Sequence, residues 1–256
     1  LSSSSAASDV YKRQANNIAA IMMEGESGTS GCIKYPPFYL KKVEELCKKY
    51  DLLLIIDEVM SGFCRTGEWF GFDNHSIKPD IISIAKGVTS GYIPLGGIMV
   101  SDDIINSFDD KVLPLGLTYS AHSVACAAAV AVLEIYENEN VIKNVKKIGN
   151  YTDKKIEKLM ENHPSFGDWR NTGMLGCIEL VKNKKSKDPL APFNATPKQM
   201  KDMNKVIKVL REEGMFTYTK WNYIFIAPPL TSTKDDIDEG IEIISKALKV
   251  ADEFCY

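Results

Sequence analysis

Two short, predominantly apolar segments constrain the fold of this chain more than any other feature. Residues 52–56 read LLLII and residues 81–85 read IISIA. Runs of this length without polar alternation are typical of strands buried on both faces of a parallel sheet. The segment from Glu58 to Asp80 is long enough for a crossover connection between parallel strands. The sequence therefore predicts an α/β domain with a mostly parallel sheet.

Further strands and helices are predicted on both sides of this pair. Residues 18–23 and 98–100 are short apolar runs, and residues 38–50 have the apolar spacing of an amphipathic helix. An alanine-rich segment, 125–136, predicts a helix that continues past Val141 to Glu157 and ends before His163-Pro164. After it, short strands are predicted at residues 174–181 and 223–226, and amphipathic helices at residues 197–213 and 234–253.

These patterns divide the chain into three parts. Residues 15–140 contain the apolar strands and form the large domain, whereas residues 141–256 predict a smaller α+β domain. Residues 1–14, LSSSSAASDVYKRQ, are serine-rich and carry no structural periodicity. These residues resemble translated adapter sequence, and on that interpretation the natural protein is expected to continue upstream. The alternative is that they form a disordered natural leader.

Composition excludes several classes of protein. The 256 residues carry a net charge of −3 with a pI near 5.8, which gives no reason to expect a nucleic-acid partner. The six cysteines are scattered without paired or histidine-flanked spacing, so neither a disulfide framework nor a metal site is expected, and a cytoplasmic location fits best. No apolar run reaches the roughly 18 residues of a membrane span, and no signal peptide is visible.

An acid and an amine follow the two buried strands. Asp57 comes directly after LLLII, and Lys86 comes directly after IISIA. If the strands are parallel, both lie at the carboxyl edge of the sheet, where ligands bind in α/β proteins. A buried lysine favours its neutral form, which attacks aldehydes to form a Schiff base. An aspartate facing a pyridine nitrogen keeps that nitrogen protonated. Val59, two residues on, would point the same way in extended backbone.

A family resemblance rests on several motifs in order. The segments LLLIIDEVMSGFCRTGEWFGF and KPDIISIAKGVTSGYIPLGG resemble the class III aminotransferases of the fold-type I enzymes, which depend on pyridoxal 5′-phosphate (PLP). The spaced matches run across residues 18–131, and weaker ones continue to the C-terminus. The resemblance implies part of the large PLP-binding domain followed by the small C-terminal domain.

The resemblance also implies roles for individual residues. Asp57 would hold the pyridine nitrogen, and Val59 would pack against the ring. Lys86 would bind the cofactor covalently and then move a proton between the substrate Cα and the cofactor. Thr118 matches a threonine that contacts the cofactor phosphate from the neighbouring subunit, which implies a homodimer with shared active sites. The cofactor-phosphate loop and the ring-stacking aromatic of the family lie upstream, so the chain alone is expected to bind PLP poorly.

The sequence constrains the identity of the substrate less tightly than that of the cofactor. Glu24 matches a family glutamate near the substrate, although Gly25 stands where proline is usual. The motifs LTYSAHSVACAAA, APFN and WNYIFIAPPL resemble the taurine aminotransferases, which transfer an amino group to pyruvate or 2-oxoglutarate. Lys220 is the nearest cation that could meet a sulfonate or carboxylate; the alternative is a solvated surface lysine. Either way, the expected substrates are a small amine and a 2-oxo acid.

Other interpretations fit fewer of the motifs. LLLIIDE resembles a Walker B strand, but no phosphate-binding G-x-x-x-x-G-K-[ST] occurs, and the downstream motifs have no role in an ATPase. No G-x-G-x-x-G follows a strand, which argues against a dinucleotide site. Decarboxylases, racemases and aminomutases built on the same framework remain open, as does a non-catalytic fragment.

Overall fold

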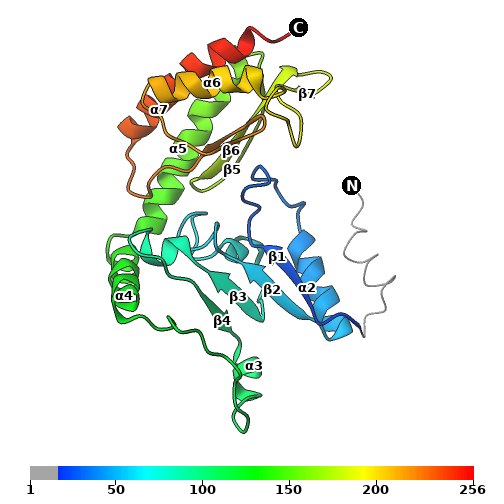
Figure 1. Cartoon of the computed structure of the whole chain (residues 1–256), viewed down its shortest axis with the longest axis vertical. Coiled ribbons are helices and arrows are strands. Elements are labelled where there is room, and N and C mark those ends of the chain that lie inside the picture. The colour runs from blue at the N-terminus through cyan, green and yellow to red at the C-terminus, as the bar shows by residue number, and fades with distance from the viewer. Residues whose placement is uncertain (1–16) are drawn as a thin grey trace. The chain divides into compact units, whose positions relative to one another are not determined.

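The computed structural model describes residues 17–256, which form two compact units (Figure 1). The first unit comprises residues 34–142 together with the described residues up to Ser27. The second comprises residues 143–256 together with Gly28–Ile33. The segment 1–14, set apart by its composition, lies outside the described residues. None of the helices that the structure describes is long and apolar enough to span a membrane.

The first unit is built on a four-stranded sheet in the order β1-β2-β3-β4. Strands β1 to β3 are parallel and β4 pairs antiparallel with β3, so the expected α/β class with a mostly parallel sheet is confirmed. No α-helix occurs in the crossover from β2 to β3; turns and one 3-10 segment make it. The elements are β1 (Ala20–Glu24), α2 (Tyr39–Tyr50), β2 (Leu53–Asp57), η2 (Gly71–His75), β3 (Ile81–Ile84), η3 (Lys86–Thr89), β4 (Gly97–Val100), α3 (Asp102–Asn106) and α4 (Ser123–Asn138).

Alternation along the strands gives this sheet two different faces. Leu54, Ile56 and Ile82 point to one side and form a buried core with Leu40 and Val43 of α2. Each such side chain contributes roughly 1.5–3 kcal/mol when it is fully buried. The residues between them point to the other face. The packing of α2 therefore fixes which side chains the opposite face presents.

A buried carboxylate fastens α2. Glu44 is only 3% exposed. It accepts hydrogen bonds from Lys41 Nζ at 2.5 Å, from Lys48 Nζ at 3.0 Å and from the backbone N–H of Lys78 at 3.1 Å. Burial alone would raise the pKa of Glu44, but the two ammonium groups and the amide outweigh it and lower the pKa from 4.5 to about 2. The carboxylate is therefore ionised in the folded protein.

Glu44 is expected to make stability depend on acid pH. Its pKa is lower in the folded state, so its contribution is complete above about pH 4.5 and is lost as the pH falls towards 2. Glu44→Gln should lower the urea midpoint at neutral pH and flatten its decline over that range. Glu45→Gln, an exposed neighbour on the same helix, is the matched control. Equal pH profiles for the two variants would contradict this prediction.

The second unit is an antiparallel sheet with three helices. The strand order is β5-β6-β9-β8, and β7 pairs with β6. Its core joins Phe166, Ile178 and Leu180 of the sheet to Val206 and Leu248 of the helices. The elements are α5 (Val141–Asn162), β5 (Phe166–Thr172), β6 (Leu175–Asn183), β7 (Asp188–Pro189), α6 (Lys201–Glu212), β8 (Thr219–Lys220), β9 (Tyr223–Ile226) and α7 (Lys234–Asp252).

Two expectations about organisation need correction. The predicted continuous helix from 125 to 157 is wrong, because α4 ends at Asn138 and α5 begins at Val141. Asn140 between them has φ 52°, a left-handed conformation that asparagine tolerates better than most residues. Gly28–Ile33 groups with the second unit, although the expected division near residue 140 assigned it to the first. A hydrogen bond of 2.7 Å from Arg170 Nε to the carbonyl of Gly31 ties it there.

Candidate functional site

Three polar residues form one row across the carboxyl ends of the parallel strands. Glu24, the last residue of β1, pairs with Asp57, the last residue of β2, and Asp57 pairs with Ser83 of β3. Paired residues of neighbouring strands point to the same face, and this is the face opposite α2. The preceding row, Met22, Ile55, Ile81 and Val100, is entirely apolar. Polar side chains are thus concentrated at the edge where α/β sheets bind ligands.

Asp57 is held by its own turn. Its Oδ1 accepts a hydrogen bond of 2.9 Å from the backbone N–H of Val59, the local pattern of an Asx turn. Within residues 17–256, no hydrogen bond is recorded for its second oxygen. The expectation that Val59 continues in extended backbone is wrong, because β2 ends at Asp57 and Val59 lies in a turn. Val59 therefore fixes the carboxylate through its amide.

Lys86 begins the short helix η3, two residues after β3 ends. Its backbone is left-handed, with φ 47°, which is uncommon for a side chain of this size. Its Nζ lies 2.6 Å from Met60 Sδ, and a thioether is only a weak acceptor. In the described part of the chain, no carboxylate forms an ion pair with it. Lys86 is exposed. The described residues therefore do not bury its amine, although the expectation of a neutral amine assumed a buried lysine.

Helix α4 supports the turn that carries Lys86. The hydroxyl of Tyr136 donates a hydrogen bond of 2.8 Å to the carbonyl of Gly87. Gly87 is also required for packing, because a Cβ there would lie 2.8 Å from Cβ of Phe63. Burial raises the pKa of Tyr136, so the phenol stays protonated and remains a donor. Tyr136 thus fixes the backbone next to Lys86.

A second buried carboxylate organises the loop after β2. Glu58 is fully buried and accepts hydrogen bonds from Ser61 Oγ at 2.7 Å and from the amides of Gly71 at 2.7 Å and Phe72 at 2.9 Å. Burial raises the pKa of Glu58, and these three donors counter only part of that effect. Because all three contacts lie within residues 58–72, Glu58 has a structural role in the loop.

Glu58 explains why glycine follows Glu24. A Cβ on Gly25 would lie 2.0 Å from Glu58 Oε1, well inside van der Waals contact. The amide of Gly25 also donates to the carbonyl of Asp57 at 3.3 Å, and proline has no N–H to make this bond. The close contact with Glu58 and the Gly25 N–H bond therefore disfavour proline at this position of the chain.

Gly25→Ala is expected to destabilise the protein by about 1–3 kcal/mol, the usual cost of overpacking a filled site. Either Glu58 must lose donors or the ends of β1 and β2 must separate. The free energy of unfolding in urea measures the effect. Gly116→Ala is the control, since a Cβ there meets nothing within 4 Å. If the two variants were equally stable, Gly25 would not be sterically required.

The two remaining predicted residues, Thr118 and Lys220, are not part of the polar row. Thr118 belongs to the first unit and is exposed in a segment between α3 and α4. No hydrogen bond to it is recorded within residues 17–256. Lys220 belongs to the second unit, where its Nζ lies 3.5 Å from the carbonyl of Thr29 and 4.3 Å from the ring centroid of Trp221. Lys220 therefore has contacts of its own within the second unit.

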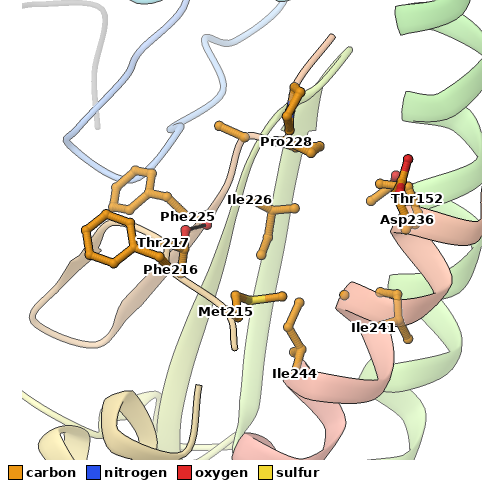
Figure 2. Close-up of a pocket in the computed structure, with 14 residues that line it drawn as sticks. Thr152, Met215, Phe216, Thr217, Phe225, Ile226, Pro228, Asp236, Ile241 and Ile244 are labelled. Carbon is orange, nitrogen blue, oxygen red and sulfur yellow. Dashed lines mark hydrogen bonds between the residues drawn. The ribbon is translucent and has the colours of Figure 1, made fainter. Parts of the chain in front are cut away.

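The second unit also contains an apolar pocket of about 230 Å³ (Figure 2). Met215, Phe225 and Ile244 line it. Its polar lining groups already have partners within the protein. Thr152 Oγ1 and Thr217 Oγ1 donate to main-chain carbonyls, and Asp236 accepts from Thr233 in the cap of α7. The side chains that line this pocket are mostly apolar, which suits it poorly to orient an amino acid, so the polar row is the better candidate.

Sequence reasoning missed three residues of the candidate site. Ser83 is the one polar residue of the IISIA run, and only the strand register shows that it neighbours Asp57. Tyr136 was assigned only to the alanine-rich helix, and its contact with Gly87 spans 49 positions. Glu58 was considered only as part of a Walker B alternative. For Ser83, the available sequence signal was a polar side chain inside an otherwise apolar strand; Tyr136 and Glu58 had no comparable signal.

The chain is similar to aminotransferases over nearly its whole length. The family Aminotransferase class-III matches residues 2–248. Gamma aminobutyrate transaminase 2 of Solanum lycopersicum is 35% identical over 245 residues, covering 94% of this chain and 52% of that protein. Putrescine–pyruvate aminotransferase of Pseudomonas aeruginosa is 37% identical over 239 residues, covering 91% of this chain and 50% of that protein. The chain thus spans about half the length of the curated relatives it matches.

A solved structure agrees with these relatives. Taurine:2-oxoglutarate aminotransferase from Bifidobacterium kashiwanohense, in complex with PLP and glutamate, superposes with a TM-score of 0.93 at 38% identity. The match covers 97% of this chain and 55% of that one. Fold, sequence and family match therefore agree, and the chain belongs to the class III aminotransferases.

Proposed function

We propose that the whole protein containing this chain transfers an amino group from a small amine to a 2-oxo acid, with PLP as its cofactor. The proposal rests chiefly on one observation. Asp57 and the turn of Lys86 follow neighbouring parallel strands and lie at the same edge of the sheet. Family membership supports the reaction class, and the PLP bound in the taurine:2-oxoglutarate aminotransferase supports the cofactor.

The unpaired groups at this edge fit the cofactor. One oxygen of Asp57 has no recorded partner within residues 17–256, which leaves an acceptor for a protonated pyridine nitrogen. Among the described residues, the Lys86 amine has the Met60 thioether as its partner and no carboxylate, so no ion pair within this part of the chain must be broken before it reacts. The hydroxyl of Ser83, in the same row, is buried and has no hydrogen-bond partner among the described residues. The chain thus offers an acid, an amine and a hydroxyl that its own described residues do not saturate.

Each residue has a defined task in this proposal. Bound PLP supplies a ring that takes up the electron pair released at the substrate Cα. Asp57 holds the proton at the pyridine nitrogen, and the Val59 amide keeps the carboxylate oriented. Lys86 anchors the cofactor through Nζ and accepts the proton from the substrate Cα as a general base. Val59 is also proposed to pack on the ring, and Glu24 lies on the same row, on the proposed substrate side.

The proposed assembly is a homodimer in a reducing cytoplasm. Thr118 is proposed to reach the cofactor phosphate of the neighbouring subunit, and its exposure leaves it accessible for that contact. The six cysteines all carry free thiols, in agreement with a reducing compartment. Light scattering of the whole protein tests the dimer, and an active monomer at assay concentration would contradict shared active sites.

The proposed donor is taurine or another ω-amino acid. Two relatives are named for taurine and for gamma-aminobutyrate, and both compounds carry an acidic group distant from the amine. Lys220 is the proposed partner of that acidic group. Its one recorded oxygen contact is a 3.5 Å approach to Thr29, which leaves ammonium donors for a ligand, and a charged hydrogen bond contributes roughly 1.5–3 kcal/mol.

The reaction class is tested by amine transfer in the whole protein. Taurine, β-alanine and 4-aminobutyrate are offered as donors, with pyruvate and 2-oxoglutarate as acceptors. The proposal expects the acceptor to be converted to its amino acid in step with loss of the donor amine. Release of CO₂, racemisation or migration of the amine, without net transfer, would assign the chain to another branch of the framework.

Lys220 is tested with the same donors. Lys220→Ala should raise KM for acidic donors about tenfold or more, since tenfold corresponds to about 1.4 kcal/mol, while leaving putrescine, which has no acidic group, nearly unchanged. Lys220→Arg keeps the positive charge and should retain most of the affinity. Equal KM values for all donors in wild type and Lys220→Ala would restrict Lys220 to packing on Trp221.

The 256-residue chain by itself is proposed to be inactive. Lys86 is exposed, and Met22 and Ile98, on the same sheet face as the polar row, are 60% and 59% exposed, so this side of the site is open to water. PLP is added to the chain and to the whole protein, followed by borohydride. Stable, borohydride-reducible visible absorbance of the isolated chain would refute this part of the proposal.

A further inference from the structure

The hydroxyl of Ser83 is a buried polar group with no hydrogen-bond partner within residues 17–256. Its backbone is fixed on both sides. Ser83 pairs with Asp57 of β2 and with Ile98 of β4, and its carbonyl accepts a hydrogen bond of 2.9 Å from the amide of Glu58. An unpaired buried hydroxyl costs free energy, so such groups in native proteins call for an explanation.

The nearest paired position across β2 supplies an acceptor. Asp57 and Ser83 are register partners, so their side chains leave neighbouring strands on the same face. Asp57 Oδ1 is engaged by the Val59 amide, whereas no bond is recorded for Oδ2 within the described chain. A serine hydroxyl reaches different neighbours by rotation between its staggered conformers. An unpaired donor therefore stands beside an unpaired acceptor.

We propose that Ser83 is a positioning residue whose hydroxyl donates to Asp57 Oδ2 and holds the carboxylate in the orientation that retains the proton of the bound pyridine nitrogen. This inference rests on the proposed PLP chemistry. A carboxylate oxygen has two lone pairs, so Oδ2 accepts from Ser83 and from the pyridine nitrogen together while the Val59 amide occupies Oδ1. Three donors then hold the carboxylate in one orientation.

The test uses the whole protein and four variants. Ser83→Ala removes the hydroxyl. Ser101→Ala is the matched control. Ser101 Oγ is also buried without a partner in the described part of the chain, but Ser101 follows β4 at the opposite edge of the sheet. Ser83→Thr and Ser83→Val form a nearly isosteric pair that differs only in keeping or losing the hydroxyl. PLP affinity, the rise in Tm on adding PLP, kcat and KM are measured for each.

The inference predicts a specific pattern. Ser83→Ala should lower kcat about tenfold and weaken PLP binding by a similar factor, as expected for loss of one hydrogen bond to a charged group. KM for the amine should stay within about twofold of wild type. Without PLP, the variant should be as stable as wild type or more stable, because a buried unsatisfied group has been removed. Added PLP should therefore raise its Tm less than it raises that of wild type.

Three outcomes would overturn the role of Ser83. They are equal PLP affinity and kcat in wild type and Ser83→Ala, equal losses in Ser83→Ala and Ser101→Ala, and equal behaviour of the threonine and valine variants. If Ser83→Ala fails to fold, the threonine and valine variants decide alone. Absence of PLP binding in the wild-type protein would instead refute the proposed function, so the two failures are distinguishable.

Discussion

Lys86→Ala is expected to abolish amine transfer, lowering kcat by about a thousandfold or more. The change removes the amine proposed to anchor the cofactor and to accept the substrate proton, and general acid–base catalysis alone contributes about 10²–10⁴-fold. Lys86→Arg keeps the positive charge but provides no neutral amine near pH 7. It should be about as inactive as the alanine variant.

The structure provides a control for this variant. Lys78 is exposed and stands before β3, at the opposite end of the strand that leads to Lys86. The interaction that Lys78 makes with Glu44 uses its backbone amide, which an alanine substitution preserves. Lys78→Ala should therefore retain normal activity. Partial recovery of Lys86→Ala by added small alkylamines would show that the missing part is the amine. Near-normal kcat without such rescue would exclude Lys86 as the reacting lysine.

Asp57→Asn is expected to lower kcat about a thousandfold. A carboxylate and a pyridinium about 4 Å apart, at an effective dielectric of about 20, interact by roughly 4 kcal/mol, and each 1.36 kcal/mol corresponds to a factor of ten. The asparagine side-chain oxygen still accepts the bond from the Val59 amide. The turn after β2 should therefore persist, and the change isolates the charge.

Two further variants separate charge from shape at this position. Asp57→Glu keeps the charge but displaces it, and it should retain more activity than Asp57→Asn. Glu24→Gln removes the neighbouring carboxylate of the same row and should change KM for the amine more than kcat. If Glu24→Gln lost as much kcat as Asp57→Asn, the two carboxylates would share the task assigned to Asp57. Thermal unfolding of each variant checks that the sheet remains intact.

The elements that sequence predicted well are those whose apolar pattern is local. LLLII and IISIA became β2 and β3, and the amphipathic segment at 38–50 became α2, because periodicity within a few residues decides which face can be buried. The parallel order of β1 to β3 then brings Glu24, Asp57 and the turn of Lys86 to one edge. Their placement at one edge follows from the parallel strand order, which the alternation of strands and helices along the sequence indicated.

The features that sequence missed depend on contacts between distant residues or on single backbone angles. The break between α4 and α5 falls in the polar stretch 137–140 and includes the left-handed Asn140. Gly28–Ile33 joins the second unit, where Arg170 bonds to Gly31 across 139 positions. The partnership of Ser83 with Asp57 is a matter of register. The last two of these have no signature within a short window of sequence.

The central claim is that Lys86 is the lysine that binds the cofactor. The most direct test is to reduce the whole protein with borohydride in the presence of PLP, digest it and locate the modified lysine by mass spectrometry. We predict a single phosphopyridoxyl group on Nζ of Lys86 and none on Lys78 or Lys220. Stoichiometric modification of any other lysine in an active enzyme, with Lys86 unmodified, would contradict the account.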